Sequence, residues 1–119
     1  MTDADRYAEA IAAELVEVAA GRLDGYDIGP DDDAGYAAAT WFAELVLDVE
    51  VSRSMTTGDV TAVKVTRTIG GPGCWCTFRV GQDAEVLVTW GRDRAYRWVP
   101  ADLVAPLTTY LHDVAEVTR

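Results

Sequence analysis

Residues 63–99 consist of short, mostly apolar segments separated by glycine turns, and this pattern restricts the fold more than any other feature of the chain. Glycine-rich turns between alternating segments are typical of β-hairpins. The central segment follows the turn Gly70-Gly71-Pro72-Gly73. On a strand there, one face would carry Cys74, Cys76, Phe78 and Val80, and the other would carry Trp75, Thr77 and Arg79. The run therefore predicts an antiparallel sheet.

Helices are predicted on both sides of this run. In residues 3–23 apolar side chains recur every three or four positions, which indicates a helix with one buried face, and Glu14 and Glu17 lie off that face. Residues 35–43 predict a short second helix. A last helix is expected to begin at Pro106 after a turn at residues 100–105, because a proline breaks a helix that runs through it.

Residues 45–53, 60–69, 85–90 and 95–99 predict further strands. In the first of these, the inward side chains are expected to be Leu45, Leu47, Val49 and Val51. In the second, one face would carry Val63, Val65 and Ile69 together with Arg67. The charged Arg67 is thus predicted to share a face with apolar residues.

The last two strands do not alternate cleanly. A turn centred on Arg92-Asp93 places Val88 opposite Arg97 and Leu87 opposite Trp98. Two explanations stay open: both sheet faces are partly covered, or a bulge near Trp90 shifts the register. The predicted architecture is a single α+β domain over residues 1–119, with an N-terminal helix, a short second helix, a mostly antiparallel meander of about five strands and a C-terminal helix.

The formal net charge of the chain is −10, and its distribution is uneven. Residues 1–50 hold 13 acidic and two basic residues, whereas residues 51–119 hold seven acidic and eight basic ones. Such a charge opposes direct binding to nucleic acid. Function, salt adaptation and genome composition are all left open as the origin of the acidity.

The sequence predicts neither a membrane span nor a secretory signal. It has no apolar run near the roughly 20 residues that a span requires, and residues 1–6 are acidic and are not followed by an apolar stretch. A cytoplasmic location, in a cell or in the host of a virus, is expected.

Cys74 and Cys76 are candidate metal ligands, and His112 is the only histidine. A zinc site needs about four ligands, so both cysteines are expected to be core residues with free thiols. His112 is expected to be placed favourably near a helix C-terminus. The acids Asp31-Asp32-Asp33 are contiguous, unlike those of a calcium loop, and are expected to cap a helix. We therefore expect no metal, no cofactor, no catalytic residue and no enzyme activity.

Two functions remain as hypotheses. The first is a small acidic protein-binding module of the inhibitor, immunity or viral anti-defence type, which occludes a basic protein partner. Its binding residues would be Glu14, Glu17, Asp31, Asp32, Asp33 and Glu50. The alternative is a small-ligand- or peptide-binding domain without catalysis, which uses the face that carries Lys64, Trp75 and Arg79, with Trp90, Tyr96 and Trp98 as further lining residues. A homodimer stays open in both cases.

Overall fold

The glycine-rich run folds into an antiparallel sheet. The computed structural model describes residues 1–23, 25 and 34–117. Its elements are α1 (Asp3–Ala19), α2 (Ala34–Leu45), β1 (Asp48–Arg53), β2 (Val60–Thr68), β3 (Gly73–Phe78), β4 (Ala84–Trp90), β5 (Asp93–Val99) and α3 (Ala101–Val117). The five described strands pair in the order β1-β2-β3-β4-β5, each antiparallel to the next. The predicted α+β meander is therefore confirmed.

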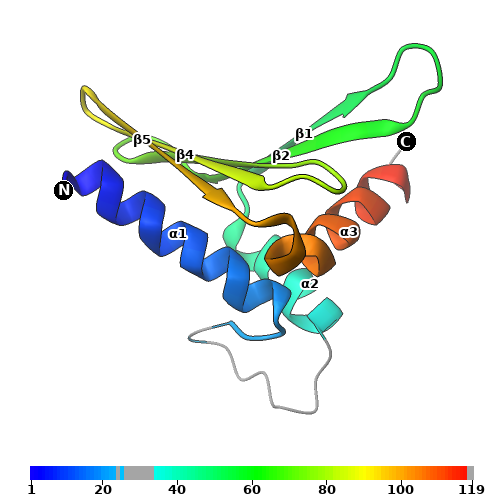
Figure 1. The fold of residues 1–119 in the computed structure, drawn as a ribbon, viewed down its shortest axis with the longest axis horizontal. Coiled ribbons are helices and arrows are strands. Elements are labelled where there is room, and N and C mark those ends of the chain that lie inside the picture. The colour runs from blue at the N-terminus through cyan, green and yellow to red at the C-terminus, as the bar shows by residue number, and fades with distance from the viewer. Residues whose placement is uncertain (24, 26–33, 118–119) are drawn as a thin grey trace.

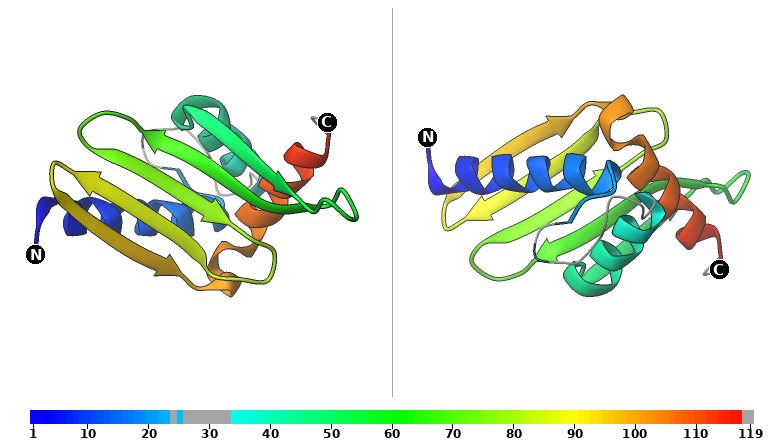
Figure 2. Two further views of the ribbon diagram at one scale, coloured as in Figure 1. Left: turned by 90° about the horizontal axis from the view of Figure 1, so that it is seen from above. Right: turned by 90° about the horizontal axis from the view of Figure 1, so that it is seen from below.

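The described helices all lie on one side of the sheet. In Figure 1 the sheet forms the upper layer and the described helices form the lower layer, and Figure 2 shows the same two layers from above and from below. α1 runs under β4 and β5, while α3 packs against β2 and the other two helices. The buried core between the layers includes Trp41, Phe78 and Leu107. The opposite side of the sheet, which no described helix covers, is called the open face.

The N-terminus of α1 is capped by Thr2. Thr2 and Asp5 form a capping box, in which the Asp5 carboxylate accepts from the Thr2 N–H and the Thr2 hydroxyl accepts from the Asp5 N–H, both at 3.1 Å. These hydrogen bonds from Thr2, together with the nearby Arg97, lower the pKa of Asp5. Arg97 Nη2 lies 3.5 Å from Asp5 Oδ1 and links β5 to the helix.

The C-terminus of α1 is a Schellman motif, in which the chain leaves the helix through a left-handed residue. Gly21 has a φ of 92°, and the Arg22 N–H donates to the Glu17 carbonyl at 2.8 Å. The helix consequently ends at Ala19, and the predicted end at Leu23 is wrong.

The predicted strand 45–53 begins later because α2 continues further than expected. α2 ends at Leu45 and β1 begins at Asp48. Leu45 packs against the core from the last turn of the helix, and Leu47 is 62% exposed, so placing both on the inward face of a strand was wrong. The alanine-rich sequence of α2 favours continued helix up to this point. Val49 and Val51 face the helix side, as predicted.

Ile69 and Val80 were predicted to point inward, and both are exposed, by 69% and 68%. Each lies beyond the end of its strand, because β2 ends at Thr68 and β3 ends at Phe78. After Phe78 the chain enters a turn in which Gly81 has a φ of 75°. Alternation does not extend past the last residue of a strand, so a strand predicted too long misplaces its terminal side chain.

The register of the last hairpin differs from the predicted one. β4 and β5 pair Trp90 with Asp93, Val88 with Ala95, Leu87 with Tyr96 and Val86 with Arg97. The turn is therefore Gly91-Arg92, and Gly91 has a φ of 62°, which glycine adopts without strain. The ladder between these strands is regular, so neither a bulge nor cover on both faces is needed to explain the sequence.

α3 begins at Ala101 because a carboxylate from another loop caps its first turn. Asp83, in the turn between β3 and β4, accepts a hydrogen bond from the Ala101 N–H at 2.9 Å through Oδ1. Pro106 lies inside the helix at an exposed position, where it removes a single backbone donor. The predicted turn at residues 100–105 is wrong, because residues 101–105 form the first turns of α3. Asp83, which stabilises this helix start, is distant in sequence and could not be recognised as its cap from the local pattern.

Replacing Asp83 by alanine is expected to lower the free energy of unfolding by about 1 kcal/mol, because the first turn of α3 loses its cap. Urea unfolding followed by circular dichroism measures the change. Gln82→Ala, at the exposed neighbouring position, is the matched control and should leave the midpoint unchanged. Equal midpoints for Asp83→Ala and wild type would contradict this role.

Candidate functional site

Two rows of side chains cross the open face from β1 to β5. The first row is Asp48, Thr66, Trp75, Leu87 and Tyr96, and the second is Glu50, Lys64, Thr77, Glu85 and Trp98. These positions alternate along the strands with buried residues such as Val65, Cys76 and Val86. Since successive side chains on a strand point to opposite faces, both rows point away from the helices.

Aromatic and apolar side chains occupy the part of the open face formed by β3, β4 and β5. On the edge strand β5, Trp98 is 59% exposed and Tyr96 is 47% exposed. Leu87 and Trp75 are partly buried in the same row as Tyr96. Trp and Tyr contribute more to protein–protein binding than most other residue types. This part of the open face, defined by these four residues, is called the aromatic patch.

Trp75 lies against the sheet because Gly73 leaves room for its ring. A Cβ atom built on Gly73 would lie 2.7 Å from Cη2 of Trp75 and 2.9 Å from Oγ1 of Thr89. The Nζ of Lys64 lies 6.0 Å from the centroid of the Trp75 ring, within the range of a cation–π interaction. Trp75 is thus part of the open face, and the structure decides against its alternative place in the core.

Acidic side chains occupy the opposite edge of the open face, on β1. Asp48 and Glu50 are both exposed, and within the described residues neither forms an ion pair. Glu50 lies opposite Lys64 in the ladder, but the Lys64 ammonium lies near the Trp75 ring. The open face therefore changes from acidic at β1 to aromatic at β5.

Glu14 was predicted to lie off the buried face of α1. In the structure its side chain points from α1 toward the sheet. Its Oε2 accepts from Arg67 Nε and from Trp41 Nε1, both at 2.9 Å, and its Oε1 accepts from Arg67 Nη2 at 3.0 Å. The side chains of Glu14 and Arg67 are 21% and 18% exposed. Glu14 raises the pKa of the Arg67 guanidinium. This cluster of three residues joins α1, α2 and β2.

Two other acids of the predicted binding surface, Glu17 and Glu50, lie in different layers of the molecule. Glu17 is on α1, where its pairing with Arg22 lowers the pKa of the Glu17 carboxyl. Glu50 is on the open face, in the other layer of the molecule. Asp31-Asp32-Asp33 lies outside the described residues. A binding surface that combines these acids stays a prediction.

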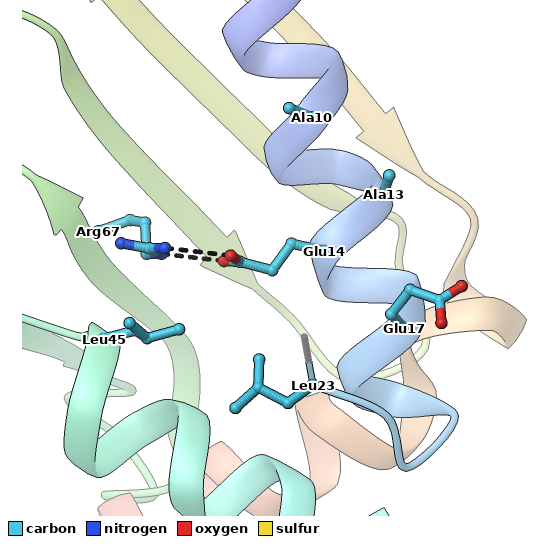
Figure 3. A pocket seen from close by; sticks show the side chains of 7 residues that line it. All are labelled: Ala10, Ala13, Glu14, Glu17, Leu23, Leu45 and Arg67. Atoms are coloured by element: carbon cyan, nitrogen blue, oxygen red, sulfur yellow. Dashed lines mark hydrogen bonds and ion pairs between the residues drawn. The ribbon is translucent and has the colours of Figure 1, made fainter. Parts of the chain in front are cut away.

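A cavity of about 360 Å³ lies between α1 and α2. Figure 3 shows its lining residues, which are Ala10, Ala13, Glu14, Glu17, Leu23, Leu45 and Arg67. In this view Glu14 and Arg67 point toward one another, and dashed lines join their polar atoms. Each charged residue in the lining is paired with a residue of opposite charge, so the lining combines apolar side chains with neutralised ion pairs.

Cys74 and Cys76 are buried in the core with free thiols, as predicted. The Cys74 thiol and burial both raise the pKa of the Cys76 thiol. His112 is also buried, and its Nε2 lies 3.1 Å from the Phe78 carbonyl. In the described residues, His, Cys, Asp and Glu side chains form no group of three or more that is suited to a metal ion.

Comparisons with protein-family models, with curated proteins and with solved structures each found no match. Within the part of the chain that the structure describes, no helix has the length and hydrophobicity needed to cross a membrane. The function must therefore be argued from the residues of this chain.

Replacing Glu14 by alanine is expected to lower the free energy of unfolding by about 2 kcal/mol, because Arg67 and the Trp41 indole N–H lose their shared acceptor in a partly buried site. Glu17→Ala removes an exposed acid from the same helix and should change the urea midpoint little. Equal effects of the two substitutions would show that the cluster contributes no more than a surface ion pair.

Replacing Gly73 by alanine is expected to displace the Trp75 ring and to lower stability by about 1 kcal/mol or more, since the new methyl group overlaps Cη2. A double-mutant cycle tests this directly. In a Trp75→Ala background, the same Gly73→Ala substitution should cost clearly less free energy of unfolding. The same cost in both backgrounds would show that the two side chains do not interact.

Proposed function

We propose that this protein is a protein-binding module that uses the open face of its sheet to occlude part of a protein partner. The observation that supports this proposal most strongly is the uncovered aromatic patch, on the side of the sheet opposite the described helices. An antiparallel sheet that faces water on one side normally carries polar residues there. Trp98 and Tyr96 are large aromatic residues in that position, and a bound partner would bury them.

The dimensions of the molecule are compatible with such an interface. It extends 40 × 39 × 24 Å along its principal axes, and the sheet spans much of its longest dimension in Figure 1. A protein–protein interface of standard size buries about 800 Å² on each partner. The open face offers aromatic residues toward one edge and polar and charged residues toward the other, so it presents both kinds of side chain that protein–protein interfaces use.

The charge of the chain favours a protein partner over a nucleic acid. Exposed aromatic residues on a sheet also occur in proteins that stack bases, but those proteins combine them with a positively charged surface. This chain has a net charge of −10, and Asp48 and Glu50 lie at the edge of the face. An acidic protein of this kind is suited to a basic partner, and complementary charge of this sort would support an inhibitor or immunity role.

The positions of the reactive side chains support binding without catalysis. Cys74, Cys76 and His112 are the residue types most often used as nucleophile or base, and all three are buried in the core. The two cysteines face the helix layer and His112 lies on α3 within that layer, so all three are on the side of the sheet away from the aromatic patch. We therefore assign no reaction to the open face.

A small ligand or peptide at Trp75 remains the alternative use of the same face. Of its predicted residues, Lys64 and Trp75 lie together, whereas Arg79 follows the last residue of β3 and is partly buried. Small molecules usually bind in concave sites. The residues that line the cavity between α1 and α2 include no residue of the aromatic patch. A protein partner therefore accounts better for residues spread over several strands.

The proposal is tested by affinity capture with three versions of the protein. Wild type and Leu103→Ala should recover the same partner protein, because Leu103 is a 48% exposed apolar residue on α3, in the other layer. The double substitution Tyr96→Ala/Trp98→Ala should lose that partner. With the purified partner, calorimetry should show an affinity at least about tenfold weaker for this double variant, since interface Trp and Tyr residues often each contribute 2 kcal/mol or more.

Unfolding curves of all three proteins supply the control for folding. Both substituted residues of the double variant are exposed on β5, so its urea midpoint should stay close to that of wild type. A partner that binds the double variant as tightly as wild type would refute a role for the open face.

A further inference from the structure

We infer that the open face binds its partner in one orientation, with cationic side chains of the partner over the β1 edge and apolar side chains over the aromatic patch. This inference rests on the proposed function and adds the chemistry of the partner. The occupant is a protein segment that carries Arg or Lys next to aromatic or aliphatic residues.

The β1 edge supplies the charge that such a partner needs. The carboxylates of Asp48 and Glu50 project from the open face on alternate positions of the same edge strand. Elsewhere in the structure, several acids are already neutralised, because Asp5, Glu14 and Glu17 each form an ion pair with an arginine. Asp48 and Glu50 form no such pair with a described residue, so they remain available to an external cation.

The opposite edge supplies the apolar contact. Trp98 and Tyr96 stand two residues apart on β5, and Leu87 lies opposite Tyr96. The positive charge nearest the middle of the face is Lys64, whose ammonium lies beside Trp75. Lys64 therefore opposes a cationic partner near the centre of the face, and attraction is concentrated at the β1 edge.

A basic partner fits the whole molecule better than a second copy of this chain. Two copies that each carry a net charge of −10 repel one another, whereas a positively charged protein is attracted over a distance of about a Debye length. The charges of the open face do not reverse this preference, since Asp48, Glu50 and Glu85 outnumber Lys64 and Arg94 among its exposed and partly buried strand residues.

The test uses a phage-displayed library of random linear peptides as the probe. Peptides are selected on the wild-type protein, and those that also bind Tyr96→Ala/Trp98→Ala are discarded. The remaining peptides bind through the aromatic patch. They are expected to be enriched both in Arg or Lys and in Trp, Phe or Leu, and selection on Asp48→Lys/Glu50→Lys should instead enrich Asp or Glu.

One selected peptide is then synthesised for measurements of its dissociation constant. Asp48→Lys/Glu50→Lys should weaken binding at least about tenfold at low salt, and high salt should reduce this difference. Lys64→Gln should strengthen binding about two- to fivefold, because it removes the like charge at the centre of the face. A gain in affinity is a result that misfolding does not produce.

The outcomes separate this inference from the proposed function. Peptides that depend on the aromatic patch but show no charge preference and no salt dependence would overturn the inference and leave the proposed function standing. A selection in which no peptide depends on the aromatic patch would overturn the inference, whereas the proposed function is decided by the capture experiment with Tyr96→Ala/Trp98→Ala. A stable dimer in sedimentation experiments that Trp98→Ala converts to monomer would also overturn the inference, because a second copy would then occupy the face.

Discussion

The one-sided cover of the sheet is the constraint on which the rest of the structure depends. The inward face is lined by small and branched apolar residues such as Val65, Cys76 and Val88, and these are buried only if helices pack against them. The described helices all supply this cover from the same side. The second face of the sheet consequently stays open, and its side chains are free to serve a function other than folding.

The cluster of Glu14, Arg67 and Trp41 is a partly buried polar connection between the two layers. A guanidinium on the inward face of a sheet is costly unless it is paired and hydrogen-bonded. Glu14 provides both oxygens to Arg67 and also accepts from the Trp41 indole. These contacts hold together α1, α2 and β2, which are distant in sequence. Glu14, which was predicted to be among the partner-binding acids, therefore acts as a structural residue.

This distinction between paired and available acids changes how the net charge of −10 should be understood. Long-range attraction depends on the total charge, and it speeds encounter with a basic partner. Local recognition depends on carboxylates that are exposed and without an ion pair at the binding face. Asp48 and Glu50 are exposed at the β1 edge of the open face and form no ion pair with a described residue, whereas Glu14 and Glu17 are each held by an arginine. Charge and apolar contact are thus separated across the width of one sheet.

The sequence by itself determined the fold class, the order of the elements and most inward residues, because glycine turns and alternating apolar residues act over short distances. It also indicated that Arg67 shares a face with apolar residues. The tertiary structure decided what depends on distant residues: Glu14 as the partner of Arg67, Asp83 as the cap that starts α3 before Pro106, and the pairing of Leu87 with Tyr96. Whether Trp75 was covered depended on which side of the sheet the helices pack against. Alternation along a strand separates its two faces, but it does not show which face the helices will cover.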